Sequence, residues 1–187
     1  MKRIIFHWTA GTYKVSALDR QHYHFIVAGN GTVVAGVFKP EDNLAPVKGK
    51  YAAHTLNCNT GSIGVAVACM AGAEPGKHGA YPMTQVQWTA LIGLVAKLAN
   101  EYNIPVTPAT ILSHAEVQDT LQIKQRGKWD IAELSFAPHI KGAREVGNLM
   151  RSEVKLLLTN IGPLGKEKAA PLSVGQRIKN WLKGNRA

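Results

Sequence analysis

A nine-residue run, SIGVAVACM at 62–70, is almost entirely apolar and constrains the fold more than any other part of the sequence. A strand exposed on one face alternates apolar and polar residues, whereas a strand covered on both faces shows a continuous apolar run. The run therefore predicts a central strand in a sheet that has other layers of structure on both sides.

Further segments predict the rest of such a fold. Residues 2–8 (KRIIFHW) predict a short buried strand, and residues 23–35 predict a hairpin that turns at Gly29-Asn30-Gly31. Residues 110–114 predict another strand. A capping box at Thr84-x-x-Gln87 begins a predicted helix that ends at Asn103, and residues 142–159 predict a second helix. Strands mixed with helices along one chain predict an α/β fold with a central mixed β-sheet flanked by helices.

Length and charge divide the chain into two parts. The 187 residues suffice for one domain with a hydrophobic core, and we place that domain at 1–159. Residues 160–187 begin with a Gly- and Pro-containing linker and hold six basic residues against one acidic residue. The net charge of +10 predicts an anionic partner, which nucleic acid, anionic lipid and cell-wall polymer would all satisfy.

The basic tail at 160–187 has the pattern of a short amphipathic helix. Its apolar stripe consists of Val174, Ile178, Trp181 and Leu182. A basic helix that carries a Trp is typical of segments that bind anionic membranes or lipopolysaccharide, and this contact is one expectation for the tail. The alternative is that the stripe packs on the domain or that the tail is frayed.

The sequence also limits the cellular compartment and the binding partners that we expect for the protein. The N-terminus lacks the apolar stretch of a secretory signal, so we expect synthesis in the cytoplasm and a separate route to any outside target. Cys58 and Cys69 are expected to be reduced core residues. Without a recognition motif, no specific nucleic-acid partner is predicted, and the chain is expected to be a monomer.

Three of the seven histidines, His7, His54 and His114, lie beside predicted strand ends. Strand ends hold side chains rigidly, which favours a metal site, although packed or solvated imidazoles are the alternative. The sequence has no HExxH helix. A zinc site would therefore have to be assembled from distant segments.

Five segments, in order, resemble the zinc-dependent N-acetylmuramoyl-L-alanine amidases, a family that includes amidase-type phage lysozymes and shares its fold with peptidoglycan recognition proteins. The resemblance covers residues 3 to about 158. The segments are IIFHWTAG, YHFIVAGNGTVV, AAHTLNCNTGSIGVAV, MTQVQWTALIGLVAKL, and ILSHAEV followed by Lys128-Trp129-Asp130.

The resemblance implies a metal site formed by His7, His114 and Asp130. Two neutral imidazoles and one carboxylate suit Zn²⁺ and leave a fourth position open for water. It also implies catalytic roles for Tyr23 and Lys128. The alternative for Tyr23 is a half-buried aromatic residue of a strand, and the alternative for Lys128 is an ordinary surface lysine.

The resemblance further implies that His54, Asn59 and Thr9 line the groove for the muramyl-peptide. Some branches of the family carry a general-base Glu two residues after the Gly of the Ser-Ile-Gly strand, where this chain has Ala66. Glu116 is better explained as a helix-capping or solvated acid. We therefore predict attack by metal-activated water, assisted by Tyr23 and Lys128.

Together these features predict a zinc amidohydrolase that cleaves the bond between N-acetylmuramic acid and L-alanine in peptidoglycan. The basic tail and the expected cytoplasmic synthesis favour a phage or prophage endolysin, a bacteriolytic enzyme that reaches the wall after membrane permeabilisation. Two alternatives stay open, a metal-free peptidoglycan-binding module and a cytoplasmic enzyme of cell-wall recycling.

Overall fold

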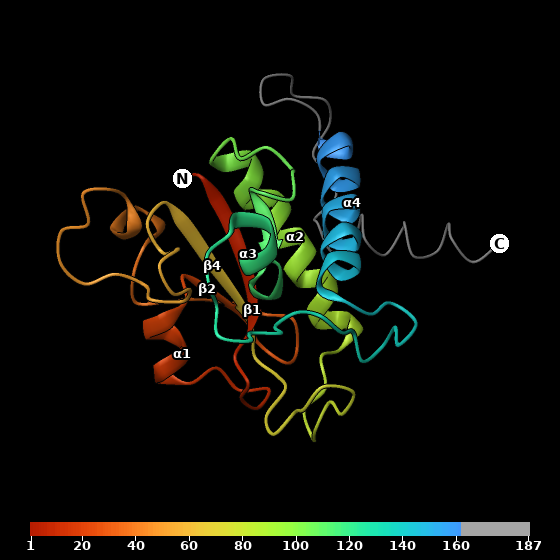
Figure 1. Cartoon of the computed structure of the whole chain (residues 1–187). Coiled ribbons are helices and arrows are strands. Elements are labelled where there is room, and N and C mark those ends of the chain that lie inside the picture. Colours follow the sequence, from red (N-terminus) through yellow and green to blue (C-terminus); the bar gives the residue numbers. More distant parts are fainter. Residues whose placement is uncertain (162–187) are drawn as a thin grey trace.

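The computed structural model describes residues 1–161, and its centre is a five-stranded sheet in the order β3-β2-β4-β1-β5 (Figure 1). The three pairings among β2, β4, β1 and β5 are parallel, and only the β2–β3 hairpin is antiparallel. The predicted α/β fold with a mixed sheet is thereby confirmed. The strands are β1 (Arg3–Trp8), β2 (Phe25–Val27), β3 (Val33–Ala35), β4 (Ser62–Val67) and β5 (Ile111–Ser113).

Helices cover both faces of this sheet (Figure 1). The predicted capping box at Thr84 is present and begins the long helix α2. None of the described helices is long and apolar enough to cross a membrane. The helices are α1 (Ala17–His22), the 3₁₀ turn η1 (Pro40–Asn43), α2 (Gln85–Glu101), α3 (His114–Leu121) and α4 (Ala143–Ile161).

Strand β1 divides its side chains between the two faces of the sheet, as the alternation of a strand requires. Ile4, Phe6 and Trp8 enter the main core with the apolar faces of α2 and α4. Ile5 points to the opposite face, where it packs with Leu112 of β5 and Val117 of α3. His7 lies on the same second face as Ile5. The candidate metal site is therefore on this second face of the sheet.

The register of the sheet places a short row of residues beside His7. Ala66 of β4 pairs with His7, and Ile26 of β2 pairs with Ala66. Tyr23 packs against Ile26 and Ala66 on this face. The sheet therefore confirms that a small apolar residue, and no acid, lies next to His7 on strand β4.

Three elements were not expected from the sequence, namely α1, η1 and α3. Helix α3 begins directly at His114, and Glu116 completes its capping box by accepting a hydrogen bond from the Ser113 backbone (2.8 Å). Glu116 is also buried against Arg151 of α4, with nitrogen–oxygen distances of 2.9 and 3.2 Å. The interpretation of Glu116 as a capping acid fits these contacts, because both its oxygens are occupied by structural partners.

The last described helix extends slightly further than expected. Helix α4 runs to Ile161, two residues past the predicted boundary at 159. The linker and basic amphipathic helix were predicted at 160–187, and residues 162–187 of that segment lie outside the described residues.

Candidate metal centre

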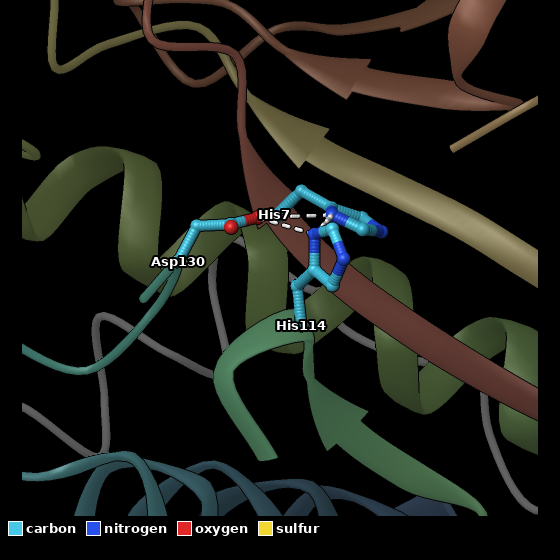
Figure 2. Close-up of side chains that lie close together, drawn as sticks. All are labelled: His7, His114 and Asp130. Atoms are coloured by element: carbon cyan, nitrogen blue, oxygen red, sulfur yellow. Dashed lines mark hydrogen bonds and ion pairs between the residues drawn. The ribbon is translucent and has the colours of Figure 1, made fainter. Parts of the chain in front are cut away.

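Three side chains from distant parts of the chain meet at the carboxyl ends of the parallel strands. His7 comes from the penultimate position of β1, His114 is the first residue of α3 directly after β5, and Asp130 comes from the loop after α3. Figure 2 shows the three side chains pointing toward one another. All three are buried, at 0%, 5% and 7% exposure respectively. Among the described residues, this is the one group of His, Cys, Asp and Glu side chains close enough together to hold a metal ion.

The spacing of the donor atoms fits a tetrahedral zinc ion. The Nδ1 atoms of His7 and His114 lie 3.1 Å apart, and Asp130 Oδ2 lies 3.0 Å from the first and 3.2 Å from the second. Ligand atoms about 2.0–2.1 Å from a tetrahedral zinc ion lie about 3.3 Å from one another. Small adjustments would therefore accommodate the ion, and the donor types are those that zinc prefers.

Contacts with residues next to His7 and His114 fix the loop that carries Asp130. Trp129 packs edge-to-face on Trp8, with 4.7 Å between ring centroids. The backbone N–H of Ala115 donates to the carbonyl of Asp130 at 2.7 Å. Because Trp8 follows one ligand and Ala115 follows another, these contacts tie the third ligand to the segments that carry the first two.

Two of the three ligands, His7 and Asp130, are free of competing protons at neutral pH. Burial, with a smaller effect from the charges of His114 and Lys128, lowers the pKa of His7 to about 4, although the contact with Asp130 acts in the opposite direction. Burial alone would raise the pKa of Asp130, but its contacts with His114 and His7 prevail and lower it to about 2. A neutral imidazole beside an ionised carboxylate is the state that binds a metal.

His54 and Thr55 lie behind His7, in the loop between η1 and β4 rather than at a strand end. His54 Nδ1 and Thr55 Oγ1 are 3.3 and 3.4 Å from His7 Nε2, and 2.8 Å from each other. Burial lowers the pKa of His54 well below its usual value, so the ring is neutral. A Cβ at Gly64 would lie 2.4 Å from the His54 ring, which explains why this strand position is glycine.

The two predicted catalytic residues flank the ligands. The Tyr23 ring lies 5.2 Å from the His7 ring, and burial together with the charge of Asp130 raises the pKa of its phenol above the usual value. Tyr23 therefore keeps its O–H at neutral pH. Lys128 is exposed, two residues before Asp130, and its charge reaches His7 closely enough to affect that pKa.

The remaining predicted groove residues have local structural partners. Asn59 Oδ1 accepts hydrogen bonds from the backbone N–H groups of His54 (2.9 Å) and Thr55 (2.7 Å), so it shapes the turn that carries them. Thr9 is half-buried just after β1, and its hydroxyl accepts a bond from the Gly11 backbone at 3.1 Å.

Sequence reasoning missed Gln125, which is 3% exposed. Its Oε1 lies 2.9 Å from His114 Nε2, on the far side of the ring from the metal-facing nitrogen. It also missed Thr55 beside His7. Neither residue carries a signal of its own, because Gln and Thr in loops are ordinary surface residues until a fold brings them against a ligand.

Comparison with known proteins places this site in a family. The sequence model of N-acetylmuramoyl-L-alanine amidase matches residues 1–131, a span that contains all three candidate ligands. No protein of curated function matches the sequence significantly.

Solved structures with a similar fold include a hydrolase, an amidase and a phage endolysin. The hydrolase AmiA of Staphylococcus aureus, in complex with its ligand, aligns with a TM-score of 0.52 and 12% identity over 87% of this chain and 77% of that chain. The amidase LysC of Clostridium intestinale aligns at 0.45 and 19% over 84% and 85%. The Ph2119 endolysin from a Thermus scotoductus bacteriophage aligns at 0.42 and 19% over 68% and 79%.

The sequence match covers more than half of the chain, and the predicted resemblance is confirmed. The chain therefore belongs to the N-acetylmuramoyl-L-alanine amidase family, whose members act on peptidoglycan.

Proposed function

We propose that this protein is a zinc-dependent hydrolase that cleaves the amide between N-acetylmuramic acid and L-alanine. The observation that carries the proposal is the convergence of His7, His114 and Asp130, whose donor atoms lie 3.0–3.2 Å apart in a buried cluster. A zinc ion held there would supply Lewis-acid chemistry, which polarises a carbonyl and activates water at neutral pH.

The residues around the metal ligands would position the substrate and stabilise the charge that develops on it. The Tyr23 O–H is available as a donor toward the reacting carbonyl or the attacking water. Lys128 would place an ammonium where negative charge develops on the carbonyl oxygen. His54, Asn59 and Thr9 are proposed to line the groove that holds the muramyl-peptide.

We further propose that the enzyme acts as a phage or prophage endolysin. The position next to His7 is Ala66, so the site lacks the strand glutamate that some branches of the family use. This departure and the basic tail argue against a cytoplasmic recycling enzyme. In this proposal the protein is made in the cytoplasm and reaches the wall after the membrane is permeabilised.

Digestion of purified peptidoglycan tests the proposed reaction. We expect new L-alanine amino termini to appear without new reducing ends, because an amide rather than a glycosidic bond is cleaved. A chelator should abolish this release, and added zinc should restore it. Reducing ends would indicate a glycosidase, release that resists chelation would contradict the metal mechanism, and binding without release would indicate a binding module.

Removal of residues 162–187 tests the proposed contact of the tail with an anionic surface. Each basic residue near such a surface contributes about 1 kcal/mol, so even two engaged residues change surface affinity roughly 30-fold. We expect the truncated protein to digest purified peptidoglycan normally but to kill intact cells much less well. A full-length variant with Gln at Arg177, Lys179, Lys183 and Arg186 serves as the matched comparison. Equal loss in both assays would favour a tail that packs on the domain.

A further inference from the structure

The buried amide of Gln125 has a fixed orientation. Its Nε2 group donates to the carbonyls of Leu56 (2.9 Å) and Ile123 (3.3 Å), which uses both of its hydrogens. Its backbone N–H donates to Gln118 Oε1 of α3 at 3.0 Å. The reverse orientation would place the amide oxygen against two carbonyl oxygens, so Oε1 must be the end that faces His114.

This orientation determines where His114 carries its hydrogen. Gln125 Oε1 can only accept, and it lies 2.9 Å from His114 Nε2. His114 Nε2 must therefore carry the hydrogen whenever the ring holds only one, which leaves Nδ1 with an unshared electron pair. That Nδ1 atom is the one that faces His7 and Asp130.

We propose that Gln125 is a positioning residue that holds His114 in the one tautomer able to bind the metal. The inference rests on the proposed metal site and extends it to a residue that touches neither metal nor substrate. The same amide ties the loop of residues 54–59 to that of residues 122–130 through Leu56, so it also holds the segments behind both imidazoles together. Residues that orient metal-binding histidines in this way typically contribute about 10–100-fold to metal affinity.

Zinc affinity of metal-free protein, measured by competition with a chromophoric chelator, tests this role. Gln125→Met removes the acceptor at similar volume, and we expect the dissociation constant for zinc to rise about 10–100-fold. The matched control, Gln122→Met, removes an exposed amide from the same loop and should leave the affinity unchanged.

A second readout follows the tautomer itself. Long-range ¹H–¹⁵N spectra of the metal-free wild type should show the His114 proton on Nε2, and Gln125→Met should show a mixture of both tautomers. This measurement on wild type does not depend on whether a variant folds.

The outcomes separate this inference from the metal site. Wild type that binds no zinc would contradict the metal site and, with it, the role of Gln125. Wild type that binds zinc, together with Gln125→Met that binds it equally tightly, would contradict the role of Gln125 alone. A wild-type proton on Nδ1 of His114 would also overturn it.

Discussion

Replacing His114 or Asp130 with Ala is expected to remove zinc from the purified protein and to lower the turnover of peptidoglycan by more than about 100-fold. The scale follows from the cost of disturbing residues that merely orient a ligand, about 10–100-fold, which losing a ligand must exceed. Zinc content per chain and kcat/KM on purified peptidoglycan measure the two effects. His7 is less suitable as a target, because it is fully buried in the interior strand β1 and its replacement would also affect folding.

The exposed His139 provides a control, since His139→Ala removes an imidazole outside the cluster. We expect it to keep both zinc and activity. Retained zinc and near-normal turnover in Asp130→Ala would mean that the carboxylate is not a ligand.

Replacing Lys128 with Ala is expected to reduce kcat by about 10²–10³-fold, the scale for loss of one donor to a developing oxyanion. Although Lys128 is exposed in the free protein, bound substrate would exclude water around it and so strengthen its interaction with the carbonyl oxygen. KM should change little, because the negative charge exists only in the transition state. Tyr23→Phe, which removes only the hydroxyl, should likewise lower kcat more than it raises KM.

Two exposed residues provide control variants for these substitutions. Lys124→Ala removes an exposed lysine from the same loop, and Tyr51→Phe removes a hydroxyl from an exposed tyrosine. Both should be close to wild type. If Lys128→Ala and Tyr23→Phe each kept normal turnover, the assigned roles of these two side chains would be wrong.

The central layers of the fold could be predicted because the sequence pattern and the packing agree there. The run at 62–70 predicts a strand covered on both faces, and every residue of β4 is buried. The capping box at Thr84 predicts the start of α2. In both cases the signal is local, since it depends on hydrophobic periodicity and on contacts within a few residues.

The short elements could not be predicted because they lack a local sequence signal of this kind. Helix α1 has no buried residue, so no apolar stripe marks it. Helix α3 begins where a strand ends, and its start depends on a capping box at Ser113 and on the buried contact of Glu116 with Arg151, 35 residues away. A pairing over that distance leaves no pattern in a single sequence.

In the candidate site, too, some residues could be predicted from the sequence and others only from the structure. The resemblance to the amidase family supplied His7, His114 and Asp130, and the structure brings these three together. Nothing in the sequence indicated Gln125, because its role exists only after the loop folds against His114. The residues behind metal ligands are therefore the part of such a site that needs a structure.

X-ray absorption spectroscopy of the zinc-loaded protein tests the central claim most directly. We predict one zinc ion per chain, bound by two imidazole nitrogens, one carboxylate oxygen and one further light atom at about 2.0–2.2 Å. His114→Ala should not retain the zinc that gives this spectrum, and His139→Ala should leave the spectrum unchanged. A zinc environment that contains sulfur, or one that His114→Ala leaves intact, would contradict the proposed metal centre.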